Sequence, residues 1–276
     1  MEATVPGPNR TGAAINPDGI ESMLEAVQDL SPPVPISTLE MDAQRQLYIA
    51  EADAVGSIPP PNSILKNTIA RVKGVTGASS MSILLDKLGE RIAFERAGTR
   101  LYSALITKYL ALTNSGAAPL PPADAIVNSM VDGDGNGVGD AGAERLEGET
   151  AMDTLLRIRA EELSHFRMLC DCVKTLGGDP TSQTPCADVT ATASMGLVQV
   201  VTDPRTTLAQ SLNAILTAEL TDNAGWELLI ELATMAGQDA LVEPFNAALA
   251  AEREHLAIVR SWLRSLVTEA PGTPAV

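Results

Sequence analysis

Hydrophobic residues recur at steps of three and four positions along four long segments of the chain. Such spacing places them on one face of an α-helix, so it predicts four amphipathic helices. Each helix is on the order of 25 to 30 residues, and hence about 40 Å, in length. The predicted helices are roughly Ser80–Leu112, Glu149–Leu176, Pro204–Ala236 and Ala240–Val267.

Polar residues interrupt the hydrophobic stripe near the middle of each predicted helix. The first and third helices carry a lone glutamate there, and the second and fourth carry the motif Glu-x-x-His, which uses both histidines of the chain. Residues three apart share a helix face, so we expect the six side chains to meet at one level of a bundle. They are Glu95, Glu162, His165, Glu219, Glu252 and His255.

The connections between these helices predict their topology. The third and fourth are joined by a short turn near Gly237-Gln238, which makes them antiparallel neighbours. The stretch from Gly177 to Asp203 is long enough to cross the length of a bundle, and Thr113–Gly148 is long enough to be an insertion. We therefore predict an all-α fold, an antiparallel four-helix bundle with one long crossover between two helical hairpins.

The first 80 residues differ from the rest because prolines break them into short pieces. Short helices are predicted over Asp18–Leu30 and Thr38–Val55. We expect an N-terminal extension that wraps or caps the main domain. The predicted parts are the extension 1–80, the bundle 81–268 with its inserted loop 113–148, and a tail 269–276.

The charge and composition of the chain argue against some kinds of binding partner, nucleic acid and membranes among them. The formal charge is −16, which argues against binding nucleic acid or anionic membranes through a general electrostatic field. No segment has the apolar length of a membrane span, and the start, Met1-Glu2-Ala3, lacks the features of a secretory signal. We therefore expect a cytoplasmic protein.

Three cysteines are too few for a disulfide scaffold, and Cys170-x-Cys172 does not have the spacing of a zinc or redox site. Cys172 falls on the core stripe, where a buried free thiol is expected. A disulfide from Cys170 or Cys172 to Cys186 is the less favoured alternative.

Four carboxylates and two imidazoles are the ligand set with which a four-helix bundle holds two metal ions. Four carboxylates also balance the charge of two divalent ions, and without metal they would repel one another and take up protons. A single Glu-x-x-His usually lies on a solvated face, and a bundle with a buried polar network and no metal is the alternative. The pattern occurs twice, however, since each lone glutamate precedes a helix with a Glu-x-x-His.

Residues 81–268, with Glu95 followed by Tyr102 and two Glu-x-x-His motifs, resemble the ferritin-like superfamily, and bacterioferritin and rubrerythrin in particular. The resemblance implies a ferritin-like bundle with a carboxylate-bridged di-iron site. It implies Glu162 and Glu252 as bridging ligands, Glu95 and Glu219 as terminal ligands, and His165 and His255 with one iron each.

The same resemblance implies a non-haem di-iron oxidoreductase that acts on O2 or peroxide, in a homo-oligomer of two or more chains. A manganese catalase-like enzyme and a non-enzymatic iron-binding or storage module are the alternatives. The extension and the insertion do not fit a standard 24-subunit storage shell. No Cys-x-x-Cys pair supplies the rubredoxin domain of rubrerythrin.

Further residues on the stripes are candidates for a supporting role. Asp222 lies one turn after Glu219 and is either an additional or supporting carboxylate at the site or a helix acid paired with an arginine. Tyr102 either hydrogen-bonds a ligand or donates an electron, or it is a core tyrosine with a satisfied hydroxyl. Trp226 and Trp262 are expected in the core.

The inserted loop contains the sequence Asp132-x-Asp-x-Asn-Gly-x-x-Asp140, which resembles the start of an EF-hand calcium loop. Position twelve of that loop is Ala143 rather than glutamate, so a flexible Gly/Asp loop is favoured. The candidate calcium ligands are Asp132, Asp134, Asn136 and Asp140.

Overall fold

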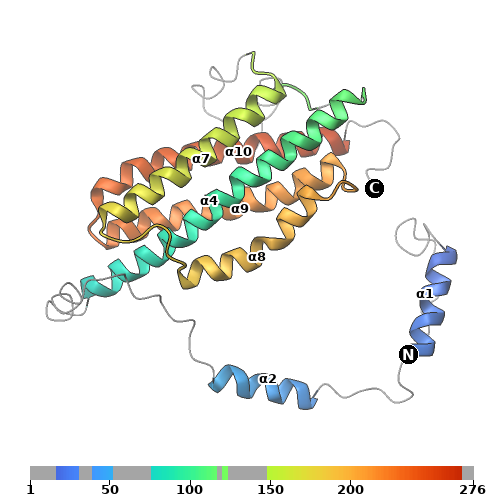
Figure 1. Ribbon diagram of the computed structural model, residues 1–276, viewed down its shortest axis with the longest axis horizontal. Helices are drawn as coiled ribbons and strands as arrows, with labels where there is room; N and C mark the ends of the chain where they lie inside the picture. Colours follow the sequence, from blue (N-terminus) through green and yellow to red (C-terminus); the bar gives the residue numbers. More distant parts are fainter. Residues whose placement is uncertain (1–16, 31–38, 52–75, 117–119, 124–147, 269–276) are drawn as a thin grey trace. The chain divides into compact units, whose positions relative to one another are not determined.

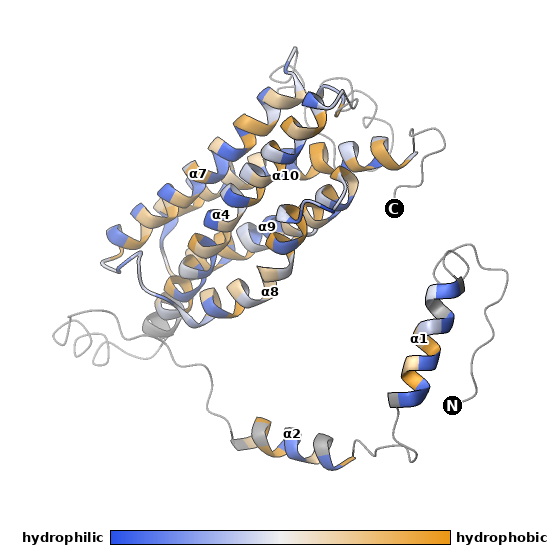
Figure 2. Ribbon diagram, turned by 45° about the vertical axis from the view of Figure 1, so that its right-hand side comes forward, coloured by the Kyte–Doolittle hydropathy of each residue, from blue (hydrophilic) through white to orange (hydrophobic). Residues whose placement is uncertain are grey.

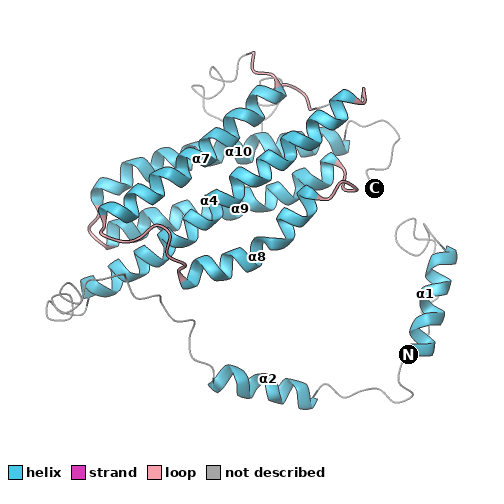
Figure 3. Ribbon diagram, viewed as in Figure 1, coloured by secondary structure: helices cyan, strands magenta, loops and turns pink. Residues whose placement is uncertain are grey.

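The computed structural model describes residues 17–30, 39–51, 76–116, 120–123 and 148–268, and these ranges contain α-helices and no β-strand (Figure 3). The all-α prediction is therefore confirmed for this part of the chain. The chain divides into two compact units, Met1–Ala54 and Val55–Val276.

The first unit contains α1 (Pro17–Leu30) and α2 (Leu39–Glu51), close to the two short helices predicted from the sequence. Hydrophobic side chains on both helices are exposed, among them Met23 and Val27 of α1 and Leu47 of α2.

The second unit contains α4 (Thr76–Asn114), α7 (Ala151–Thr175), α8 (Pro185–Thr202), α9 (Leu208–Met235) and α10 (Asp239–Thr268). The four predicted long helices correspond to α4, α7, α9 and α10, which lie side by side in Figure 1. The helix α8 packs along α4 and α9. None of the helices in the described ranges has the length and apolar composition of a membrane span.

Two hydrophobic clusters fill the second unit, one on either side of the level at which polar residues interrupt the stripes. One, the Trp226 cluster, includes Leu84, Leu88, Leu169, Trp226, Leu229 and Phe245. The other, the Trp262 cluster, includes Leu105, Ile158, Leu212, Ile215, Val259 and Trp262. Figure 2 shows how hydrophobic and hydrophilic residues alternate along the helices that supply them.

These clusters also give the direction of each helix. Both α4 and α10 begin in the Trp226 cluster and continue into the Trp262 cluster, whereas α7 and α9 run the opposite way. Since α7 and α9 are parallel, the chain must return along the unit between them, and α8 makes that return. The turn from α9 to α10 is short, as predicted, and Gly237 has the positive φ of 66° that closes a helix C-terminus.

All three cysteines are free thiols, and Cys172 is buried as expected for its place on the core stripe. The predicted burial of the two tryptophans is confirmed, since neither Trp226 nor Trp262 is exposed. The Trp262 indole donates a hydrogen bond of 2.9 Å to the carbonyl oxygen of Pro121, in the connection between α4 and α7.

Candidate metal centre

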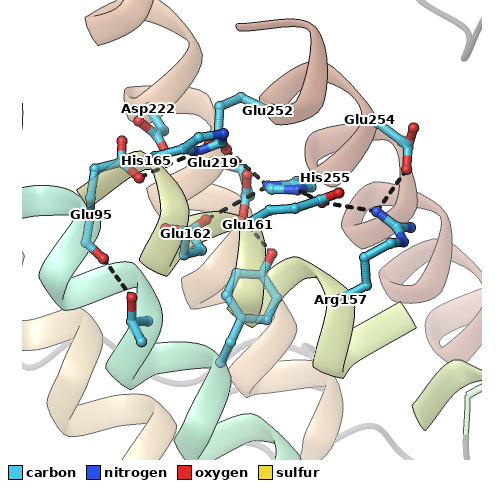
Figure 4. Close-up of polar contacts among 12 residues, drawn as sticks. Glu95, Arg157, Glu161, Glu162, His165, Glu219, Asp222, Glu252, Glu254 and His255 are labelled. Carbon is cyan, nitrogen blue, oxygen red and sulfur yellow. Dashed lines mark hydrogen bonds and ion pairs between the residues drawn. The ribbon is translucent and has the colours of Figure 1, made fainter. Parts of the chain in front are cut away.

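The six polar residues of the stripes come together between the two hydrophobic clusters, and all six are buried. Figure 4 shows their carboxylates and imidazoles pointing toward one another from four helices. Glu95 comes from α4, Glu162 and His165 from α7, Glu219 from α9, and Glu252 and His255 from α10.

Two overlapping groups of these side chains are able to hold a metal ion. In each group, one ligand atom from every residue lies within 4.8 Å of the others. Both groups contain Glu252, so the two candidate metal positions share this carboxylate. The first group is Glu162, Glu219, Glu252 and His255, and the second is Glu95, His165 and Glu252.

Glu252 places one oxygen before each imidazole. Its Oε1 lies 2.6 Å from Nδ1 of His165, and its Oε2 lies 3.0 Å from Nδ1 of His255. The two imidazole centroids are 6.4 Å apart. A carboxylate that faces two imidazoles with separate oxygens is in the place that a bridge between two ions would take.

Unsatisfied polar atoms gather at this site. Five of the six residues bury a ligand atom that forms no well-aligned hydrogen bond, although two of these atoms, His165 Nδ1 and Glu252 Oε1, form an ion pair at 2.6 Å. Such atoms are rare in native proteins, because each costs the free energy of its lost hydration unless an ion or another group binds it. The atoms are Glu95 Oε2, Glu162 Oε2, His165 Nδ1, Glu219 Oε2 and Glu252 Oε1.

The carboxylates respond unequally to this crowding. Burial, together with the charge of Glu252, raises the pKa of Glu162 well above its usual value and raises the pKa of Glu219 to about 8. Burial also acts to raise the pKa of Glu252, but the two imidazoles outweigh it and hold this pKa at about 2. The metal-free site therefore retains protons on some of its acids at neutral pH.

The imidazoles hold protons as well. Burial alone would lower the pKa of His165, but Glu252 and Glu95 raise it to about 10. The pKa of His255 rises well above its usual value because Glu252, Glu161 and Glu162 outweigh its burial. A metal ion binds deprotonated ligands, so it would take the place of these protons.

A further set of residues holds the candidate ligands in position. The Tyr102 hydroxyl donates a hydrogen bond to Oε1 of Glu219, as one interpretation of its sequence position predicted. Nε2 of His255 lies 2.8 Å from Glu161, which in turn contacts Arg157 at 2.9 Å. Asn223 donates from Nδ2 to the backbone oxygens of Glu219 and Glu252, at 3.0 and 3.1 Å, so it ties α9 to α10 at the site.

Gly98 makes room for one of the carboxylates. A Cβ at this position would lie 2.0 Å from Oε2 of Glu162, closer than real Cβ atoms approach other heavy atoms. The role of Gly98 was not predicted from the sequence. Its only signal there was a glycine inside a long predicted helix, three residues after Glu95, where a helix would otherwise prefer another residue.

Asp222 was interpreted from the sequence either as a carboxylate at the site or as a helix acid paired with an arginine, and the structure has features of both. It forms a buried ion pair with Arg91, and one of its oxygens also lies within 4.8 Å of ligand atoms of Glu95, Glu162 and Glu252. Arg91 and Glu161 were missed by sequence analysis. They lie one turn before Glu95 and directly before Glu162, where charged residues on a helix are ordinarily solvated.

The candidate calcium ligands Asp132, Asp134, Asn136 and Asp140 lie outside the described residues.

No protein-family model, curated protein or solved structure matches the chain.

Proposed function

We propose that the chain is a dinuclear metal protein of the ferritin-like kind, with a di-iron site that acts on O2 or peroxide. The observation that carries the proposal is the set of four buried carboxylates and two buried imidazoles, which face one another inside a hydrophobic bundle. The donor set supports iron or manganese, because carboxylates and imidazoles suit both ions.

In this proposal Glu162 and Glu252 would be shared by the two positions, as the ferritin-like resemblance implies, and Glu95 and Glu219 would each bind at one. His165 and His255 would each bind one ion. Two bound iron ions would supply the electrons for the reduction of O2 or peroxide, while the protein provides a fixed, dry environment.

The surrounding residues have roles that do not depend on which ion binds. Tyr102 holds one oxygen of Glu219, so the other oxygen is left to face the site. Glu161 fixes the orientation of the His255 ring through Nε2. The Trp226 and Trp262 clusters close the site from both sides, so bulk water is kept from the ligands.

Metal analysis of the purified protein, followed by anaerobic loading with Fe(II) and exposure to O2, tests the proposal. About two irons per chain and consumption of O2 support a di-iron enzyme. Bound manganese with steady release of O2 from peroxide would indicate the catalase-like alternative. Uptake of iron far beyond two per chain would indicate storage.

The matched variants are Glu162→Gln with Glu252→Gln, against Glu231→Gln with Glu243→Gln on exposed parts of α9 and α10. We expect the first pair to lose the bound metal, because Glu252 is shared by both positions and Glu162 belongs to the group that contains His255. The exposed pair should keep it. Unchanged metal content in the first pair contradicts the site assignment.

A further inference from the structure

A buried arginine lies at the edge of the candidate metal centre. Only 2% of Arg91 is exposed, and its Nη2 donates a hydrogen bond of 2.8 Å to Oε1 of Glu95. The same guanidinium forms the ion pair with Asp222. A cation is therefore already present beside a site whose other features favour metal ions.

The packing around Arg91 fixes the guanidinium in this place. Its central carbon lies 4.5 Å from the ring centroid of Phe94 and 5.7 Å from that of Trp226. Gly225 on α9 leaves the space that the guanidinium fills, since a Cβ there would lie 2.5 Å from Nη1. Both α4 and α9 are thus shaped to accept this side chain.

The half of the site on α4 and α7 and the half on α9 and α10 differ in the residues that form this ion pair. Arg91 stands four residues before Glu95, and the corresponding position before Glu219 is Ile215, a buried core residue. Asp222 stands three residues after Glu219, and the corresponding position after Glu95 is Gly98. The ion pair has no counterpart in the other half, so it lies outside the repeated six-ligand pattern.

The hydrogen-bond donors to Glu95 and Glu219 also differ between the two halves of the site. Each glutamate has Oε1 held by a hydrogen bond and Oε2 without one, and Oε2 of Glu95 lies 3.7 Å from Nδ1 of His165. The donor to Glu219 is the neutral hydroxyl of Tyr102, whereas the donor to Glu95 is a cation. A charged donor repels a nearby metal ion, unless a countercharge compensates it.

The charges of Arg91 and Asp222 cancel, so the four glutamates still balance two divalent ions. We propose that Arg91 is a positioning residue that makes the two metal positions unequal, with Asp222 as its counterion. Arg91 binds Oε1 of Glu95, as the Tyr102 hydroxyl binds Oε1 of Glu219, so each glutamate offers one oxygen to its metal position. Only the position beside Glu95 has a guanidinium next to it, so this position fills second.

The inference rests on the proposed two-metal site, and titration with Co(II), followed by calorimetry and visible absorption, tests it. The wild-type chain should bind two ions in two separable steps. Asp222→Asn leaves the Arg91 charge uncompensated, so the second step should weaken by about tenfold or more while the first stays within a few-fold. Arg91→Gln combined with Asp222→Asn removes both charges and should regain the second ion.

Asp171→Asn is the matched control, because Asp171 is an exposed helix acid paired with Lys174. It should leave both steps unchanged. Metal-free melting curves show whether each variant folds, and if the double variant does not, an Asp222→Asn variant with an unaltered second step still overturns the inference.

Several results would overturn the inference. Two ions bound by the wild type in one step would do so, as would an Asp222→Asn variant with an unaltered second step. Loss of the second ion in both the single and the folded double variant would make Asp222 itself a ligand. A wild-type chain that binds no Co(II) would instead contradict the proposed metal site.

Discussion

At the scale of single residues, Gly98 offers a direct way to disturb the site without disturbing the helix. In Gly98→Ala the new Cβ would displace Oε2 of Glu162, which is the end of a flexible side chain and can move away. We expect metal affinity to fall by about ten- to a hundredfold, the usual cost of misplacing groups around a metal. The metal-free protein should melt as before or slightly higher, because alanine favours a helix by up to about 1 kcal/mol over glycine.

Gly196→Ala is the control for this variant, since a Cβ at that position of α8 meets no atom within 4 Å. It should gain similar helix stability and retain full metal content. Equal metal binding by the two variants would show that the position of Glu162 does not matter to the site.

Some residues of the candidate site were predicted from the sequence, and others were not. The positions of Glu95, Glu219 and the two Glu-x-x-His motifs on one face of each helix followed from helical periodicity, and the structure brings all six side chains together. Gly98, Arg91 and Glu161 were missed because their roles depend on a neighbouring helix. Gly98 approaches a side chain of α7, Arg91 pairs with α9, and Glu161 contacts α10.

At the scale of elements, the bounds of the four long helices agree with the predicted ones to within a few residues, since their stripes, turns and caps are local signals. The helix α8 was not expected within the crossover. Its only charged residue is Asp188, so no contrast between polar and apolar faces marks it as amphipathic. Thr184 as N-cap and Pro185 after it were the available signals.

Lys108 of α4 holds the turn between α8 and α9. Its ammonium group donates to the backbone oxygens of Asp203 and Thr206, at 3.1 and 3.0 Å, and to Oγ of Ser211 at 2.7 Å. In Lys108→Met these acceptors lose the ammonium donor while the aliphatic stem remains. We expect the free energy of unfolding, measured by urea denaturation, to fall by about 1–3 kcal/mol.

The metal content of Lys108→Met should not change, because the turn lies outside the metal centre. Lys174→Met is the control, since the Lys174 side chain is 60% exposed and its ion pair within the described ranges is with Asp171 on its own helix. A loss of stability as large in Lys174→Met as in Lys108→Met would rule out a specific role for the turn.

At the scale of the whole molecule, the buried ionisable groups make the stability of the metal-free protein depend on pH. The folded protein raises the pKa of Glu219 from 4.5 to about 8 and that of His165 from 6.5 to about 10. Glu219 therefore binds more protons in the folded than in the unfolded state between about pH 5 and 8, and His165 does so from about pH 6.5 upward. Stability falls as pH rises across this window, so we expect a lower Tm at pH 8 than at pH 5.

Glu219→Gln isolates part of this effect. The amide cannot lose a proton, and its oxygen can still accept the hydrogen bond from Tyr102, so the decline of Tm with pH should become shallower. The charges at the molecular surface are otherwise the same in both proteins. A Tm that stays level or rises from pH 5 to pH 8 in the metal-free wild type would contradict the predicted proton uptake.

The division of the site between two helical hairpins has a consequence for the order of events in folding. In the part of the chain that the structure describes, every group of residues able to hold an ion draws on both α4–α7 and α9–α10. Neither hairpin forms a complete set of ligands, and the α8 crossover makes their docking a contact between distant parts of the chain. Because such contacts form late, the chain becomes competent to capture metal only near the end of folding. Metal uptake would then report a completed tertiary structure, and a chain released after α7 would carry three of the ligands without a site.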